Sequence, residues 1–190
     1  MNTKYHTFWR RFFAGWCDGL IFLPLGIVNV FIKNLDIPVL FIIVWLFVYV
    51  FAVPVYTILM HGRFGQTLGK MATGIIVLHV SENRIINYEE AVIRESPNLI
   101  GSLFFFVMTV YLEFDTDAFT NHAFVITYGI LSSANAIWFL VEIITMFSNK
   151  KRRALHDYLA HSVVIRKEAF IIPELELEME AGYQHNKNIA

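Results

Sequence analysis

The sequence predicts an all-α membrane protein: a four-helix transmembrane bundle with a small cytoplasmic β-hairpin and both termini in the cytoplasm. The first supporting observation is composition. Hydrophobic residues make up 56% of the 190 residues and charged residues only 16%, with a mean hydropathy of +0.53, whereas soluble domains contain about 45–50% apolar and about 25% charged residues. In addition, the apolar residues form four long runs, and the basic residues gather at one set of run ends.

The four runs approach the length of about 20 apolar residues that a helix needs to cross a bilayer. We expect spanning helices at residues 12–32, 39–60, 98–114 and 123–147. The run at 39–60 contains no charged residue, and the run at 98–114 is the shortest.

The distribution of basic residues predicts the orientation. Fourteen of the fifteen Lys and Arg residues precede the first run, lie between the second and third, or follow the fourth. Only Lys33 lies on the opposite side, where the segment 113–117 is acidic. Cytoplasmic loops carry an excess of Lys and Arg, so we expect both termini in the cytoplasm, with the protein in the cell (inner) membrane. The basic run at 150–153 should lie among anionic headgroups of the lipid bilayer.

The central cytoplasmic loop, residues 61–97, contains a β-branched run at 74–80, a turn, and a second run at 85–88. This pattern predicts a small β-hairpin, and the strand-like run at 161–167 is able to pair with it.

The chain is expected to consist of a membrane domain at residues 5–167 and a tail at 168–190. The tail is acidic and has few residues that could form a core, so partial disorder is expected.

Asp18 lies inside the first span, where a charged residue costs about 2.5–3.5 kcal/mol. It should therefore face the interior of the bundle, pair with another group or be protonated. Arg11 precedes it by seven residues, close to two helical turns. Two interpretations of Asp18 remain open: a structural clasp held by hydrogen bonds, or a titratable site for protons or monovalent cations. Glu142, near the cytoplasmic end of the fourth span, is able to meet Asp18 or Arg11. Asn29 and Asn135 are expected to form hydrogen bonds between helices.

No motif indicates an enzyme, and we expect no catalytic residues and no cofactor. Gly69 and Lys70 end a glycine-rich stretch, but Met71 stands where a phosphate-binding loop requires Ser or Thr. His156 and His161 have poor spacing for a metal site. The net charge of −1 gives no indication of a nucleic-acid partner.

Three motifs, in order around the apolar runs, resemble those of the RDD family of small membrane proteins. They read "RFFAGWCDGLIF", "GQTLGKMATGIIVL" and "RRALHDYLAHSVVIRK". The family takes its name from one arginine and two aspartates, and the resemblance covers most of residues 5–167.

The resemblance implies roles for particular residues. Arg11 and Asp18 match the first arginine–aspartate pair, and Asp157 matches the second aspartate. The other matching positions form a structural motif at the cytoplasmic face: Gly69, Lys70, Arg94 and His156. One departure is that His161 and Ser162 stand where the family pattern commonly has Gly and Thr.

The resemblance implies a part in transport of ions or other ligands, with some members linked to sodium/proton exchange. Our first hypothesis is a small transporter or cation/proton exchange component, forming a homo-oligomer. In it Asp18 is the titratable carboxylate, Arg11 its partner and Glu142 a second site. The alternative is a membrane scaffold or assembly factor without transport activity, which docks partners through its cytoplasmic loop and tail.

Overall fold

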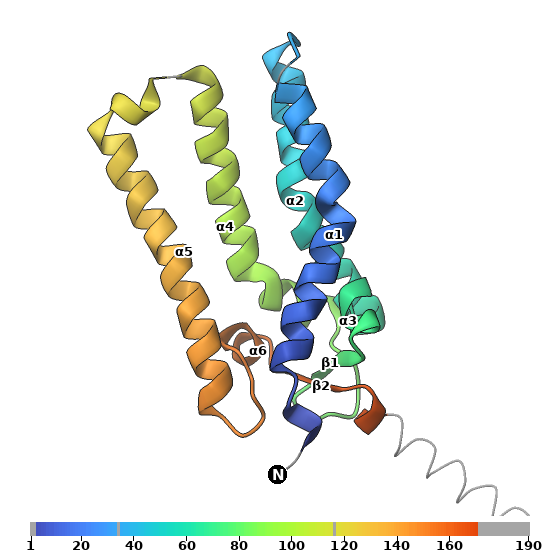
Figure 1. Cartoon of the computed structure of the whole chain (residues 1–190). Helices are drawn as coiled ribbons and strands as arrows, with labels where there is room; N and C mark the ends of the chain where they lie inside the picture. The colour runs from blue at the N-terminus through green and yellow to red at the C-terminus, as the bar shows by residue number, and fades with distance from the viewer. Residues whose placement is uncertain (1–2, 34, 116, 171–190) are drawn as a thin grey trace, which may run out of the picture.

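Four long helices run side by side, and a small lobe of short helices and two strands lies at one end of them (Figure 1). The computed structural model describes residues 3–33, 35–115 and 117–170. The long helices are α1 (Phe8–Lys33), α2 (Val39–Phe64), α4 (Tyr88–Phe114) and α5 (His122–Ser148). The remaining elements are η1 (Thr3–Tyr5), α3 (Leu68–Ala72), β1 (Ile75–His79), η2 (Ala118–Thr120), α6 (Leu155–Leu159) and β2 (Ser162–Arg166).

The described residues contain the four expected long apolar helices in the predicted order, and each is long and apolar enough to cross a membrane. Each helix continues beyond its predicted bounds at the end that carries the lobe. The largest difference is in α4, which begins at Tyr88 instead of residue 98. Its start is fixed by a capping box, in which the Asn87 side chain accepts from Glu90 N and the Glu90 carboxylate accepts from Asn87 N.

The sheet of the lobe has two strands, and β1 pairs with β2 in antiparallel register from Ile75 opposite Arg166 to His79 opposite Ser162. The predicted pairing with the run at 161–167 is therefore correct. The predicted hairpin is wrong in its second arm, because residues 85–88 contribute a single bridge, Ile85 to Leu78. The chain cannot continue as a strand there, since α4 begins immediately after Asn87.

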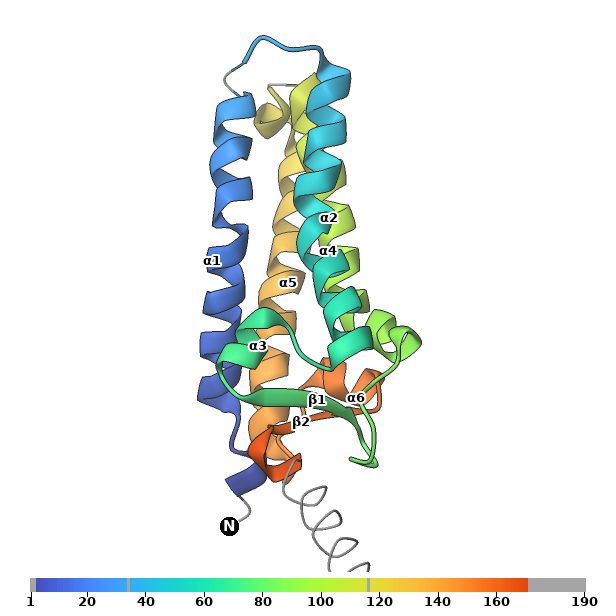
Figure 2. The ribbon, with the colours of Figure 1, turned by 90° about the vertical axis from the view of Figure 1, so that its right-hand side faces the viewer.

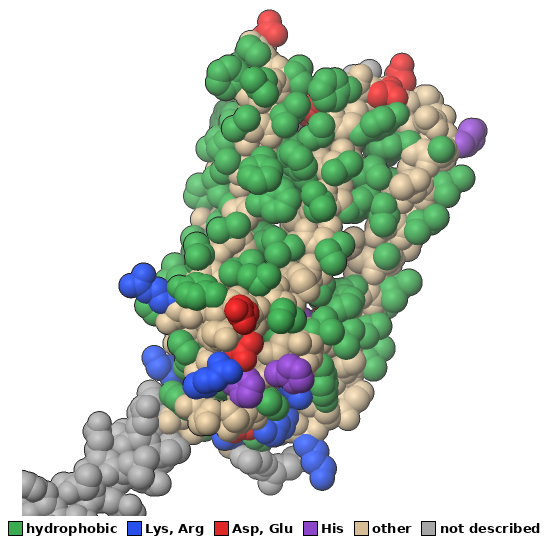
Figure 3. Space-filling view, turned by 180° about the vertical axis from the view of Figure 1, so that it is seen from behind, with side chains coloured by type: hydrophobic (Ala, Val, Ile, Leu, Met, Phe, Trp, Pro, Cys, Tyr) green, Lys and Arg blue, Asp and Glu red, His purple; other side chains and the backbone are tan. Residues whose placement is uncertain are grey.

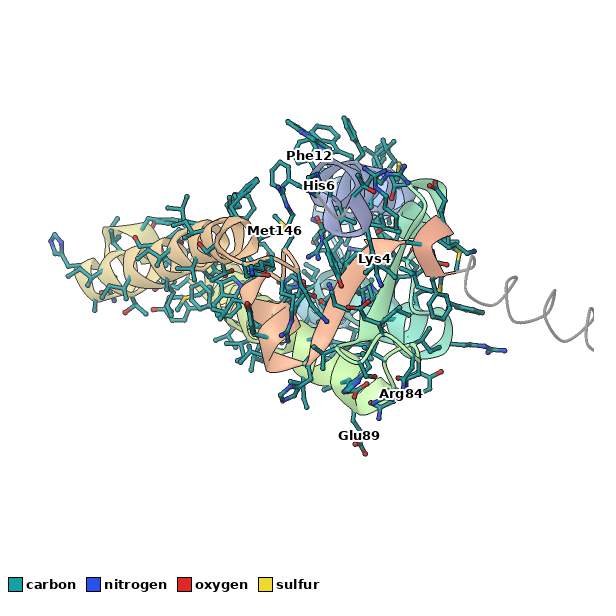
Figure 4. The ribbon with its side chains drawn as sticks, turned by 90° about the horizontal axis from the view of Figure 1, so that it is seen from below. Lys4, His6, Phe12, Arg84, Glu89 and Met146 are labelled. Atoms are coloured by element: carbon teal, nitrogen blue, oxygen red, sulfur yellow. The ribbon has the colours of Figure 1, made fainter. Side chains whose placement is uncertain are left out.

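The two faces of the sheet pack against different partners, because side chains alternate along a strand. Ile75, Val77 and Val164 pack with Ala14 of α1 and Ala91 of α4. The opposite face carries Ile76, Leu78, Val163 and Ile165, covered by Tyr5, Ile85 and Phe170. The sheet thus lies across the lobe ends of α1 and α4, below the long helices in the side view and clear of most of α5 in the view from below (Figures 2 and 4).

Apolar side chains cover the outside of the long helices, while charged side chains gather over the lobe and at the opposite tip (Figure 3). Large residues such as Leu40, Ile100 and Phe139 are more than 60% exposed. A water-soluble surface rarely carries an apolar area of this extent, whereas a lipid-facing surface requires it. Most of the predicted tail, residues 171–190, lies outside the described residues.

Candidate functional site

Asp18 accepts three hydrogen bonds from groups outside its own helix. The donors are the Tyr56 hydroxyl on α2 at 2.9 Å, the Thr67 hydroxyl at 2.6 Å and the Gly69 backbone N–H at 2.8 Å. Thr67 is also the N-cap of α3 and accepts from Lys70 N. The carboxylate therefore joins α1, α2 and the start of α3, an arrangement that favours the interpretation of Asp18 as a clasp.

Gly69 allows α3 to approach α1 closely. A Cβ at this position would lie 2.1 Å from the Ala14 carbonyl oxygen and 2.9 Å from the Asp18 carboxyl carbon, which no side chain permits. Lys70 follows, half-buried beside this contact. Burial, together with the nearby charge of Arg94, lowers the pKa of Lys70 to about 8.

Arg11 is not the partner of Asp18, in contrast to the first hypothesis. Its guanidinium donates to Asp157 Oδ2 at 2.7 Å, to the Arg152 carbonyl at 3.2 Å and to the Thr7 hydroxyl at 3.2 Å. The correction has a geometric cause. Asp18 lies nearly two turns further along α1 and points toward α3, while the lobe brings Asp157 directly to Arg11.

Asp157 is fully buried and is the centre of the polar cluster inside the lobe. It accepts from Arg11, from Arg94 at 2.9 Å, from the Ser162 hydroxyl at 3.1 Å and from the Ala154 backbone N–H at 3.1 Å. Burial raises the pKa of Asp157, but the charges of Arg11 and Arg94 outweigh burial and hold it well below the ordinary range. Two arginines from different helices thus share one ionised carboxylate.

Glu142 meets neither Asp18 nor Arg11; its partner is His156 at the start of α6. One carboxylate oxygen accepts from the His156 backbone N–H at 3.0 Å, and the other lies 2.5 Å from His156 Nδ1. His156 Nε2 lies 3.0 Å from Arg94 Nη2. Because arginine only donates, Nε2 must accept and Nδ1 must carry the proton that faces Glu142. A chain of hydrogen bonds therefore runs from α5 through α6 to α4.

A buried pair that the sequence analysis did not select is His61 with Glu95. His61 Nδ1 lies 3.9 Å from Glu95 Oε1, beyond hydrogen-bond distance, and both residues are less than 10% exposed. Neither ring nitrogen of His61 has a hydrogen-bond partner among the described residues. Asn98 Nδ2 donates to the other carboxylate oxygen at 2.8 Å. The gap between His61 and Glu95 is thus bordered on the His61 side by two ring nitrogens that lack partners among the described residues.

Glu95 also lines a cavity of about 860 Å³ between α1, α2, α4 and α5. Most of its wall is apolar, from residues such as Phe22, Val50 and Phe105. The polar residues in the wall are Tyr49, Thr57, Glu95, Asn98, Ser102 and Asn135.

The predicted hydrogen bond between helices is present at Asn29, which accepts from Trp45 Nε1 at 3.2 Å, whereas the Asn135 amide donates to the Leu131 carbonyl of its own helix.

The signal that could have identified His61 and Glu95 lies in the helix ends. Both residues fall within 61–97, which the hydropathy pattern assigns to a loop, but α2 continues to Phe64 and α4 begins at Tyr88. Continuing the helical period past each apolar run would have placed both side chains inside the bundle. Among the described residues, no group of three or more His, Cys, Asp or Glu side chains is arranged to hold a metal ion.

The fold and the site together define a helical protein whose described residues include four helices long and apolar enough to span a membrane, with a polar cluster inside its lobe. The family model for the RDD family matches residues 5–161, and the chain belongs to this family of membrane proteins. Arg11, Asp18 and Asp157, the residues that carry the resemblance, all lie in the site described above. No curated protein and no solved structure matches the chain.

Proposed function

We propose that the protein exchanges monovalent cations for protons across a membrane, with Glu95 as the carboxylate that binds them in turn. The observation that supports this proposal is the open cavity between the four long helices, with a buried acid at its lobe end and His61 beside that acid. Ionisable residues inside membrane spans are costly, and they commonly mark ion or proton pathways.

The chemistry follows from the partners of Glu95. One carboxylate oxygen accepts from Asn98, while the other faces the unpartnered His61 nitrogen across 3.9 Å. An ionised Glu95 attracts a cation into the cavity, and a proton on Glu95 removes that attraction. Cation and proton therefore compete for one site. Asp18 and Glu142 are less suited to this task, because each holds its own set of donors.

The test is flux in proteoliposomes that contain a pH-sensitive dye and hold an acidic interior. Addition of NaCl, KCl or LiCl outside should release protons with the wild-type protein, and Glu95→Gln should abolish the release. Glu89→Gln is the matched control, because Glu89 lies on the same helix but is exposed and points away from the molecule (Figure 4). Asp18→Asn tests the first hypothesis in the same assay.

The outcomes separate the alternatives. Proton release by Glu95→Gln at the wild-type rate contradicts the role of Glu95, and loss of flux in a well-folded Asp18→Asn protein transfers that role to Asp18. Absence of flux with every cation in the wild-type protein contradicts the exchange function and favours the scaffold hypothesis. Thermal unfolding of each purified variant shows whether it is folded.

The orientation and assembly belong to the same proposal. The lobe carries most of the basic residues, so it should lie in the cytoplasm of the cell, with both termini on that side. Reporter fusions at residue 35 and at the C-terminus should report opposite sides of the membrane.

The cavity extends along four helices of a narrow bundle, and we expect a homo-oligomer, to be tested by light scattering in detergent.

A further inference from the structure

Two adjoining hollows lie where α1 begins and α5 ends, separate from the cavity described above. Their volumes are about 520 Å³ and 530 Å³. His6, Phe147 and Arg152 line both of them. His6 lies close to Phe12 in the view from below, at the edge of the molecule opposite Arg84 and Glu89 (Figure 4). The hollows are therefore at the level where the membrane spans give way to the lobe.

Positive charge dominates the walls of these hollows. The basic residues that line them are Arg10, Lys150, Lys151, Arg152 and Arg166, and none of the described lining residues is Asp or Glu. Two of these residues are engaged elsewhere. Lys151 forms an ion pair with Glu82, and Arg10 donates to the Thr73 carbonyl and lies 3.7 Å from Glu168.

The other two arginines form no ion pair among the described residues. The Arg152 guanidinium lies 5.5 Å from the centre of the Phe147 ring and has no acidic partner among the described residues. Arg166 Nε is buried and lacks a hydrogen-bond partner within the described ranges. Unpaired guanidinium groups that converge on a hollow form a site for an anion, above all a phosphate, which accepts several hydrogen bonds at once.

The position of Arg152 is fixed by the polar cluster of the lobe. Its backbone adopts a left-handed conformation with φ of 48°, which costs energy for any residue except glycine. Its N–H donates to the Asn149 carbonyl, and its own carbonyl accepts from Arg11. Arg11 is in turn held by Asp157. Strained positions of this kind are found preferentially at functional sites.

An aromatic face continues from the hollows along α1. Trp9 is 66% exposed and Trp16 is 65% exposed. The Trp9 and Phe12 rings are in contact, as are those of Phe12 and Trp16, with centroids 6.0 Å and 6.3 Å apart. Tryptophan at the end of a spanning helix is typical of the boundary between acyl chains and headgroups. A molecule with a phosphate in the hollows would lay its apolar part along this face.

From this geometry we infer that the hollows bind the phosphate headgroup of an anionic phospholipid, with Arg152 and Arg166 on the phosphate and the acyl chains along Trp9 and Phe12. The aromatic face is the reason to choose a phospholipid over free inorganic phosphate, since free phosphate has no apolar part. This site lies outside the Glu95 cavity and does not depend on the proposed exchange function.

The test measures lipid retained by purified protein. The protein in detergent is mixed with phosphatidylglycerol or with phosphatidylcholine, and bound lipid is counted by native mass spectrometry. Thermal unfolding with and without each lipid gives a second readout, because a ligand that binds only the folded state raises its stability. The variant is Arg152→Gln. Arg63→Gln is the matched control, because Arg63 is an exposed arginine near the end of α2 and loses the same charge.

The wild-type protein and Arg63→Gln should retain phosphatidylglycerol in preference to phosphatidylcholine. Arg152→Gln should bind phosphatidylglycerol about fivefold more weakly, as expected for one basic charge at a headgroup, and should lose most of the thermal shift produced by that lipid. Equal weakening by Arg63→Gln, or equal retention of phosphatidylcholine, would overturn the inference. Displacement of the lipid by millimolar inorganic phosphate would assign the site to free phosphate instead.

Discussion

The pairing of Arg11 with Asp157 gives the sharpest prediction for stability. The two residues are 146 positions apart, with 2.7 Å between Arg11 Nη1 and Asp157 Oδ2, and their side chains are 13% and 0% exposed. Removal of one partner of a buried ion pair costs about 3–5 kcal/mol. Arg94 still holds Asp157 at 2.9 Å when Arg11 is lost, so we expect Arg11→Gln to cost about 2–3 kcal/mol, near the value for a hydrogen bond to a charged group.

Asp157→Asn should cost more, about 3–5 kcal/mol, because it leaves both arginines without their carboxylate. The double variant should then show a coupling energy of about 2 kcal/mol between positions 11 and 157. A second cycle, combining Arg11→Gln with Asp18→Asn, should show coupling within about 0.5 kcal/mol of zero. Asp18 has its own donors in Tyr56, Thr67 and Gly69 and makes no contact with Arg11.

Both cycles can be measured by reversible unfolding in mixed detergent micelles, followed by tryptophan fluorescence. Coupling below about 0.5 kcal/mol between Arg11 and Asp157 would contradict the buried pair. Coupling of equal size between Arg11 and Asp18 would restore the pairing within α1 that the sequence spacing first indicated.

Four further substitutions test three separate features. Gly69→Ala should destabilise the protein by about 1–3 kcal/mol through its clash with the α1 backbone. The control Gly15→Ala has open space around its Cβ position and should be neutral or stabilise α1 by about 0.5–1 kcal/mol. Equal effects of the two substitutions in thermal unfolding would contradict the close approach of α3 to α1. His161→Gly should raise the melting temperature, since φ at this exposed residue is 47° and relief of about 1–2 kcal/mol exceeds the entropic cost of glycine; a lower melting temperature would refute this. Burial raises the pKa of Glu82, but hydrogen bonds, first among them that from Lys151, lower it to about 2 from 4.5. Because the folded-state pKa is depressed, the contribution of ionised Glu82 to the free energy of unfolding is complete above pH 4.5 and is lost as the pH falls toward 2. The free energy of unfolding measured across this range should therefore fall less steeply in Glu82→Gln, and an unchanged slope would count against the ion pairs of Glu82.

Features that depend on local composition could be predicted from the sequence. The same dependence on composition placed the ends of the predicted helices wrongly. Apolar length identified the four spans, but it ended them at 60 and restarted them at 98, where polar residues enter. Helices do not end where hydropathy ends. The caps are what end them: Gly65 in the left-handed conformation after α2, and Asn87 before α4. His61 and Glu95 lie in these polar helix ends, which explains why they were assigned to a loop.

Pairing between distant segments could not be predicted in the same way. The spacing of Arg11 and Asp18 indicated a shared helix face, but nothing in the spacing shows that each side chain meets a different element. His161 illustrates the opposite case. It stands where the family pattern commonly has glycine, and its backbone nevertheless adopts the left-handed conformation that favours glycine. Ser162 at the neighbouring position donates to Asp157.

The pairing of β1 with β2 has a consequence for biosynthesis. β1 is complete once residue 79 has been made, but its partner strand begins at Ser162, after the two further long helices α4 and α5. At about 5–20 residues per second, β1 waits on the order of ten seconds with an apolar, unpaired edge. Arg11 waits longer for Asp157. The newly made chain therefore needs protection from aggregation until β2 emerges, and a ribosome that stops before residue 157 leaves the four long helices without the α6 and β2 part of their lobe.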